Sequence, residues 1–194
     1  MIFLSFSLQP YGVEAAESLA YASQTAFAGQ TSDSWRLREW PFADTQAAVQ
    51  AAFALCLQTV DGHIPCAWSV LENEHVIGVI AVTHMDDACQ TGLLGTYITP
   101  HKRGQGIQKI AKELLFARLP KPIETLFCVI VTANRSYLQA IRKIPYATLV
   151  DPADYNRLPP AVLVEVWRAR TPVAVYQLPI KNACRTENFP FCPE

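Results

Sequence analysis

The chain has 194 residues, of which 51% are hydrophobic and 17% charged, and its formal net charge is -1. This length suffices for one sizeable hydrophobic core, and no internal repeat is evident. A net charge so close to zero argues against a general attraction to nucleic acid or to an acidic membrane surface, so that any positive patch must be local.

The first residues of the chain and the pattern of its cysteines indicate a cytoplasmic protein. The opening residues, MIFLSFSL, are apolar but lack the basic residues that begin a secretory signal. No run approaches the ~20 apolar residues of a membrane helix. The six cysteines form no CxxC pair, and without a secretion signal we expect no disulfide framework. We also expect no metal site, because the spacing of His63, Cys66, His84 and Cys89 matches no tight zinc-finger pattern. We therefore expect a cytoplasmic protein with no membrane partner.

The first half of the chain predicts a strand, two helices and a hairpin. Alternating apolar residues indicate a strand, and an Ala-rich segment that ends before Gly29 indicates a helix. A second apolar pattern at helical spacing follows, and then two strands joined at Asn73 and Glu74. In chain order these elements are Ile2–Leu8, Val13–Ala28, Thr45–Gln58, Cys66–Glu72 and His75–Met85.

The second half predicts strands that alternate with helices. The expected strands are Thr91–Thr99, Thr125–Thr132, Tyr146–Val150 and Ala161–Arg170, with helices after residue 106 and over Asn134–Lys143. The order is β-α-α-β-β-β-α-β-α-β-β, which predicts an α+β (mixed α/β) fold with a central mixed sheet flanked by helices. We expect one domain over residues 1–170 and a proline-rich C-terminal extension over residues 171–194.

The segment ITPHKRGQGIQKIAKELL, residues 98–115, places Gly104 and Gly106 between a predicted strand and a predicted amphipathic helix. Glycines free the backbone to turn, and the first N–H groups of a helix attract anions. Six Lys or Arg residues against one Glu lie between Pro100 and Pro122, and we place Lys109, Lys112 and Glu113 on the solvent side of the helix. The segment predicts a site for a diphosphate, although a tight turn before a solvated helix is the alternative.

Two nucleotide motifs do not fit this segment. A dinucleotide fingerprint would need a third glycine where Lys109 stands, and the P-loop pattern is absent. The segment resembles the acetyl-CoA motif of the GNAT superfamily of N-acetyltransferases, which is Arg or Gln, two residues, Gly, one residue, then Gly or Ala. Here Arg103, Gly106 and Gln108 stand at those places, so that Gln108 departs from the small residue of the family.

A second segment, VTANRSYLQAIRKIPYATL, resembles the end of a GNAT strand, an asparagine, a short helix and a turn into the next strand. Asn134 falls on the asparagine of the family. Within the superfamily, the branch of the ribosomal-protein alanine acetyltransferases is the most similar. This resemblance implies that acetyl-CoA binds in a cleft between the strands that contain GTYIT and FCVIV.

The resemblance also implies which residues hold acetyl-CoA. The pantetheine arm would pair with backbone near the end of the strand that precedes the glycines, and Gln108 would either crowd the diphosphate or present only its amide N–H. The implied cofactor-binding residues are Tyr97, Ile98, Arg103, Gly104, Gln105, Gly106, Ile107, Gln108, Lys109 and Asn134.

Candidate catalytic residues are fewer. Many relatives carry a carboxylate on the cofactor strand, but residues 91–100 contain none. The candidate bases are His84, Asp86, Asp87 and Glu165, and we select His84 because an imidazole titrates near neutral pH; a structural or solvent-exposed His84 is the alternative. A tyrosine that protonates the leaving thiolate in relatives is replaced by Ile141. Tyr137 is the candidate acid, with packing on the sheet as its alternative role.

These features predict an N-acetyltransferase that transfers the acetyl group of acetyl-CoA to a small amine or a peptide N-terminus. The missing strand carboxylate and Ile141 favour a second hypothesis, a non-catalytic acyl-CoA-binding module. A third is a structural or dimerisation domain that makes its contacts through the segment from Thr171 onward. A homodimer formed through residues 161–170 or through that segment stays open.

Overall fold

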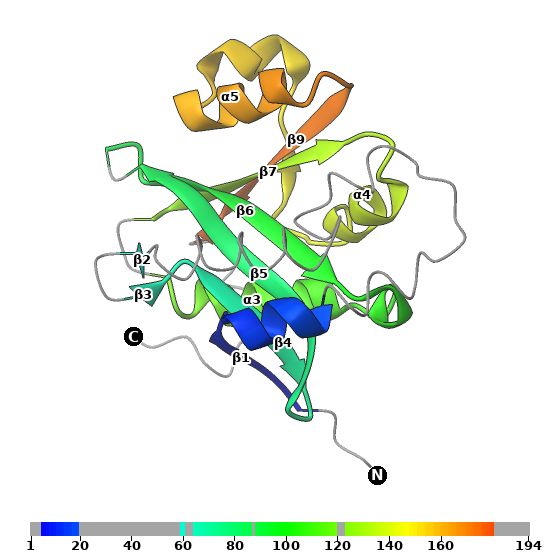
Figure 1. Ribbon diagram of the computed structural model, residues 1–194. Helices are drawn as coiled ribbons and strands as arrows, with labels where there is room; N and C mark the ends of the chain where they lie inside the picture. The colour runs from blue at the N-terminus through cyan, green and yellow to red at the C-terminus, as the bar shows by residue number, and fades with distance from the viewer. Residues whose placement is uncertain (1–4, 20–58, 61–63, 87, 120–122, 181–194) are drawn as a thin grey trace. The chain divides into compact units, whose positions relative to one another are not determined.

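The structure is a computed structural model that describes residues 5–19, 59–60, 64–86, 88–119 and 123–180. Its strands form a seven-stranded sheet in the order β1-β4-β5-β6-β7-β9-β8, and β2 and β3 form a small separate pair (Figure 1). The strands are β1 Phe6–Pro10, β2 Thr59–Val60, β3 Ile64–Pro65, β4 Ala67–Glu72, β5 His75–Asp86, β6 Thr91–Ile98, β7 Thr125–Val131, β8 Thr148–Leu149 and β9 Val173–Pro179.

The helices are α3 Ile107–Phe116, α4 Arg135–Ile141 and α5 Pro160–Arg168, with 3-10 turns η1 Pro100–Lys102 and η2 Pro152–Arg157; residues 13–19 are also helical. Strands β6 and β7 run parallel, whereas the pairs β1–β4, β4–β5, β7–β9 and β8–β9 are antiparallel. The predicted mixed sheet with flanking helices is therefore confirmed. The second predicted helix, over Thr45–Gln58, lies outside the described residues.

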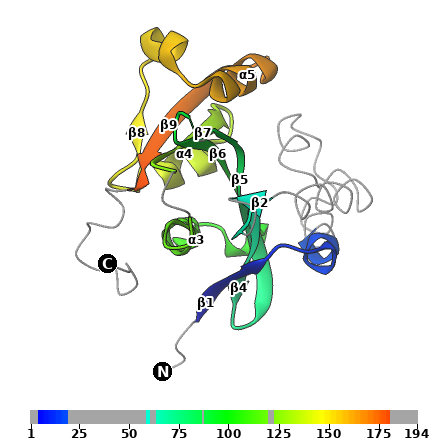
Figure 2. The same cartoon turned by 90° about the vertical axis from the view of Figure 1, so that its left-hand side faces the viewer.

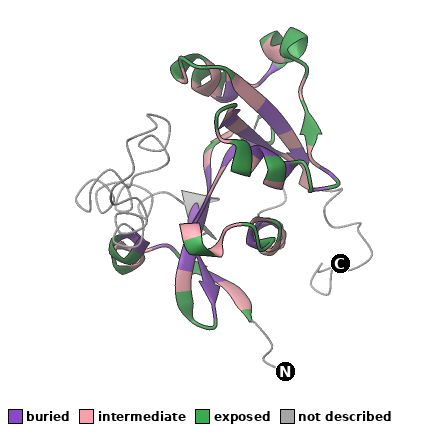
Figure 3. Ribbon diagram, turned by 90° about the vertical axis from the view of Figure 1, so that its right-hand side faces the viewer, coloured by how far each residue is buried: buried purple, intermediate pink, exposed green. Residues whose placement is uncertain are grey.

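The chain divides into two compact units. The first comprises residues 1–81 and 96–114, and its core is built on β4, which is buried along its whole length (Figure 3). The predicted hairpin is present. Its turn residues Asn73 and Glu74 have φ values of 47° and 71°, as expected for the tight two-residue turns that match the twist of a hairpin.

The second unit comprises residues 82–95 and 115–194. Successive side chains of β7 point to opposite faces, and a helix contacts each face. The hydroxyl of Tyr137 on α4 contacts Cys128, while Phe127 packs in a cluster with Leu158 and with Val162 of α5. Figure 2 shows both helices beside these strands. This unit therefore buries β7 on both faces, as its unbroken apolar sequence predicts.

Two predictions at the C-terminal side are wrong. Residues 161–168, predicted as a strand, belong to helix α5, which begins at Pro160 and buries Val162. Residues 173–179, predicted as part of the extension, form β9, which lies between β7 and β8. The sheet thus continues past the predicted domain boundary at residue 170. Among the described residues, no helix is long and apolar enough to cross a bilayer.

Candidate functional site

The junction between β6 and α3 contains the two glycines of the predicted site. Gly104 and Gly106 have φ values of 80° and 79°, in the left-handed region that favours glycine. Apart from the two adjoining residues, a Cβ atom placed on either glycine would meet no atom of the described chain within 4 Å. Helix α3 begins directly afterwards, at Ile107. The loop therefore leaves open space beside the first N–H groups of the helix, which have no partner inside it.

The end of β6 fixes the position of this loop. The N–H of Thr99 donates to the carbonyl of Ile77 at 2.9 Å. On β5, a Cβ atom on Gly78 would lie 2.4 Å from the carbonyl oxygen of Tyr97, so that only glycine permits this approach of the two strands. Tyr97 and Ile98, the residues implied to pair with pantetheine, are 5% and 3% exposed. Their side chains are part of the core.

Arg103 is bound to the strand that precedes it. Its Nε donates to the carbonyl oxygen of Ile98 at 2.9 Å, and its guanidinium carbon lies 5.5 Å from the centre of the Tyr97 ring. This arrangement combines a hydrogen bond with a cation–π contact. The bond to Ile98 uses one of the five N–H donors of the guanidinium and orients the group.

The lysines of the segment are less available to a ligand than their number suggests. Lys102 forms an ion pair with Glu72 of β4, and Nζ of Lys109 lies 3.7 Å from Oε1 of Glu113. Lys112, predicted on the solvent side of α3, is fully buried, and its Nζ donates to Oγ1 of Thr96 at 3.3 Å. The prediction of an exposed Lys112 is therefore wrong. Two of the three lysines thus lie near carboxylates, and the third is buried.

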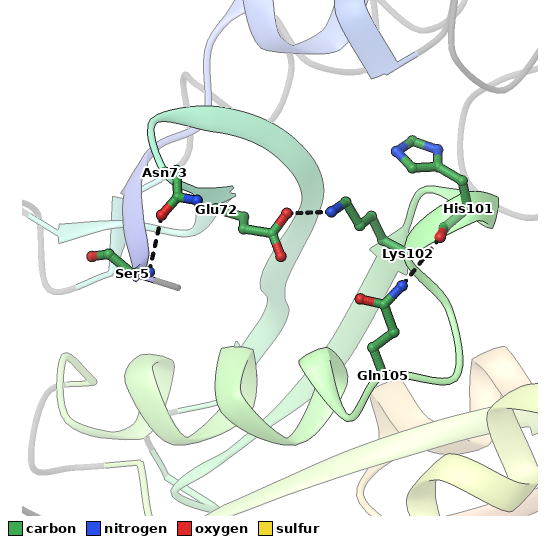
Figure 4. Close-up of polar contacts among 6 residues, drawn as sticks. All are labelled: Ser5, Glu72, Asn73, His101, Lys102 and Gln105. Carbon is green, nitrogen blue, oxygen red and sulfur yellow. Dashed lines mark hydrogen bonds and ion pairs between the residues drawn. The ribbon is translucent and has the colours of Figure 1, made fainter. Parts of the chain in front are cut away.

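Glu72 lies in this region but was not among the predicted site residues. It stands in the hairpin sequence LENEHV, 30 positions before Lys102, where no local pattern signals a partner. Figure 4 shows its carboxylate directed at the Lys102 ammonium. Within the same loop, the side-chain amide of Gln105 donates to the carbonyl of His101 at 3.3 Å.

Gln108, the departure from the family pattern, is partly buried. Its Oε1 is fully buried and has no hydrogen-bond partner among the described residues. The side-chain amide is therefore turned into the protein and not extended into solvent.

The start of α4 contains the second group of predicted residues. Oδ1 of Asn134 accepts hydrogen bonds from the N–H of Tyr137 and the hydroxyl of Ser136, each at 3.1 Å, and thereby caps the helix. The Tyr137 hydroxyl donates to Sγ of Cys128 at 3.7 Å. Ile141, at the place of the family tyrosine, is fully buried. The second unit thus brings Asn134, Tyr137 and Cys128 together.

The predicted base, His84, lies near the end of β5 in the second unit. It is exposed, its φ is 50°, and its Nδ1 is 3.1 Å from Oγ1 of Thr83. Nearby, the N–H of Cys89 donates to the carboxylate of Asp86 at 3.0 Å, and this bond holds the pKa of Asp86 below its ordinary value. These two are the candidate bases that this turn supplies within the described residues.

The other two candidate bases lie elsewhere. Asp87 is outside the described residues. Glu165 lies on α5 and not on a strand, and its Oε1 is 2.7 Å from Nη1 of Arg168, so that its carboxylate is engaged in an ion pair. Among the described residues, no group of three His, Cys, Asp or Glu side chains is arranged to hold a metal ion.

No protein-family model matches the sequence, and no curated protein matches it. Solved structures do match. The ribosomal alpha-N-protein acetyltransferase RimL in complex with coenzyme A is 15% identical, with a TM-score of 0.64 over 90% of this chain and 94% of that one.

Two further structures agree with this match. An acetyl transferase of Salmonella typhimurium that modifies the N-terminal serine of a 50S ribosomal subunit protein is 13% identical, with a TM-score of 0.65 over 90% of this chain and 95% of that one. The microcin C7 self-immunity acetyltransferase MccE, in complex with acetyl-CoA and AMP, is 13% identical, with a TM-score of 0.62 over 90% of this chain and 92% of that one. The chain therefore has the fold of the GNAT acetyltransferases.

Proposed function

We propose that the protein is an acetyl-CoA-dependent N-acetyltransferase whose acceptor is a primary amine, either of a small molecule or of a peptide N-terminus. The observation that carries this proposal is the loop before α3, where two left-handed glycines leave open space beside the first N–H groups of a helix. Support also comes from the fold, which is shared with acetyltransferases whose structures contain coenzyme A or acetyl-CoA.

The diphosphate of the cofactor would bind the N–H groups of residues 104–108. Backbone N–H groups suit this task because they are fixed by the loop and the helix and need no side-chain ordering. The guanidinium of Arg103, oriented by Ile98, would meet the remaining phosphate charge. The backbone of Tyr97 and Ile98 would pair with the pantetheine arm, as the resemblance to the family implies.

The reaction that we propose is a direct attack in a ternary complex. The amine nitrogen attacks the thioester carbonyl, the carbon–nitrogen bond forms, and the carbon–sulfur bond breaks. The amine gives up one proton to a base, and the leaving thiolate takes one proton from an acid, so that the reaction is balanced. We assign the base to His84 and the acid to Tyr137, whose phenol is the one acidic O–H that α4 carries among its described residues.

A non-catalytic acyl-CoA-binding module is the second candidate. It is favoured by the buried Ile141 at the place of the family tyrosine and by a β6 strand without a carboxylate. Such a module would bind acetyl-CoA but release no free coenzyme A in the presence of amines. The transferase would release coenzyme A only when an acceptor is present.

The first experiment compares the melting temperature with and without acetyl-CoA. A ligand at 100 times its dissociation constant stabilises the folded state by about 2.7 kcal/mol, which raises the midpoint of a chain of this size by roughly 5–10 °C. Arg103→Ala should reduce that rise. An amine panel, with free coenzyme A as the readout, then separates the two candidates. No rise at saturating ligand would exclude both.

A further inference from the structure

The ion pair between Glu72 and Lys102 has no role in the proposed chemistry, yet it lies beside the loop that the proposed function uses. Glu72 is 8% exposed, and a carboxylate is withdrawn from water at a cost that only a good partner offsets. The pair joins the end of β4 to η1, two elements of the first unit. It therefore holds the start of the loop against the sheet.

The carboxylate belongs to a well-anchored part of the sheet. The backbone of Glu72 is paired with Phe6 of β1 on one side and with His75 of β5 on the other. The next residue, Asn73, exchanges two hydrogen bonds with Ser5. Its N–H donates to the Ser5 carbonyl at 2.9 Å. Its Oδ1 accepts from the Ser5 N–H at 3.1 Å, the bond drawn in Figure 4. Glu72 is thus held in place by the sheet and can anchor the loop.

The loop itself needs such an anchor to be ordered before a ligand binds. Gly104, Gln105 and Gly106 are exposed, and glycine loses more backbone entropy on ordering than any other residue. A ligand that binds a loosely ordered loop must offset this entropy, whereas a loop ordered in advance binds the same ligand more tightly. Lys102 immediately precedes the Arg103–Gly106 turn, so that fixing its side chain restricts the turn from one end.

We propose that Glu72 is a positioning residue for the cofactor site. Through Lys102, it holds residues 100–106 in the conformation that receives a diphosphate before any ligand arrives. The inference rests on the proposed function, because it takes the diphosphate of coenzyme A as the ligand. The charge of Lys102 then orders the loop through its ion pair with Glu72 and does not itself attract the anion.

The test compares Glu72→Gln with Lys102→Met, because these substitutions change the local charge in opposite directions. If the pair orders the loop, both weaken the binding of coenzyme A about 3–10-fold, as measured by calorimetric titration. Amide hydrogen exchange of residues 100–106 in the ligand-free protein becomes faster in both variants. The KM for acetyl-CoA rises while kcat at saturation is unchanged, which a general loss of stability would not produce.

Two variants serve as controls. Glu74→Gln removes the same charge from an exposed position of the same hairpin and leaves the affinity unchanged. Lys102→Arg keeps a cation that can pair with Glu72 and retains more affinity than Lys102→Met. If Glu72→Gln does not fold, Lys102→Met tests the same pair from its more exposed end.

The outcomes separate this inference from the function on which it rests. Suppose that the wild-type protein binds coenzyme A. Tighter binding of coenzyme A by Glu72→Gln would then overturn this inference but not the proposed function, and so would an unchanged affinity and an unchanged rate of amide hydrogen exchange in both variants. A wild-type protein that does not bind coenzyme A overturns the proposed function and this inference with it.

Discussion

The junctions that lead into α3 and α4 have the same plan, a strand followed by a short loop and a helix, but they present different groups. Before α3, Gly104 and Gly106 leave the first N–H groups of the helix beside open space. Before α4, the side chain of Asn134 accepts from the N–H of Tyr137. The second junction therefore uses a side-chain oxygen to take up an N–H group of its helix, whereas the first has open space at its two glycines.

The largest expected effect is on kcat, and it comes from removal of the Tyr137 hydroxyl at the second junction. Tyr137→Phe should lower kcat about 100-fold, because general acid catalysis contributes at least that factor, and should leave the affinity for acetyl-CoA unchanged. Steady-state kinetics with separate titration of the cofactor measures both quantities.

Tyr155→Phe is the matched control. The Tyr155 hydroxyl donates to the carbonyl of Val173 and accepts from the N–H of Val175, each at 3.3 Å, and because both partners are backbone groups its loss should change stability and not kcat. An unchanged turnover in Tyr137→Phe would leave its hydroxyl with a purely structural role beside Cys128.

A smaller effect, on binding, is expected from the first junction. Gly106→Ala places a Cβ atom at a left-handed position, which costs roughly 1–2 kcal/mol, and directs it into the open space beside the helix. The ligand-free loop should relax out of the left-handed conformation, so that binding must restore it. The affinity for coenzyme A should then fall about 10-fold, since 1.4 kcal/mol corresponds to that factor, while kcat at saturation should be retained. Calorimetric titration measures the loss.

Gly12→Ala provides the control for this change, because a Cβ atom there also meets nothing within 4 Å beyond the two adjoining residues, but no left-handed φ is required. Equal affinity in Gly106→Ala and the wild-type protein would mean that the loop does not hold the diphosphate.

Much of the first junction could be predicted because its signals are local. The glycine pair, the preceding strand and the amphipathic helix all lie between Thr91 and Phe116, and all three are present. The partners of its charged side chains could not be predicted in the same way. Glu72 reaches Lys102 from another strand, and the burial of Lys112 depends on how α3 packs on β6, so the count of positive charges overstated what a ligand meets.

The error over α5 has a different cause. Val162, Val164 and Val166 alternate along the sequence and favour a strand. The two prolines before them fit the first turn of a helix equally well, and Val162 and Val166 then fall on one helical face toward Phe127. Val164, on the other face, is 43% exposed. Packing against β7, which is distant in sequence, decides between the two patterns.

The smallest effect separates the two roles that Asn134 could have. Asn134→Ala removes the cap of α4 and should destabilise the protein by about 1 kcal/mol, a fall of roughly 2–4 °C in melting temperature. Asn134→Asp keeps the oxygen that accepts from Tyr137, so its melting temperature should equal that of the wild-type protein, but it lacks the amide N–H donors. A loss of acetyl-CoA affinity in Asn134→Asp would therefore assign a cofactor contact to those donors. Unchanged affinity would mean that Asn134 caps α4 and makes no contact with the cofactor. The donors to the cofactor would then be the backbone N–H groups at the α3 junction.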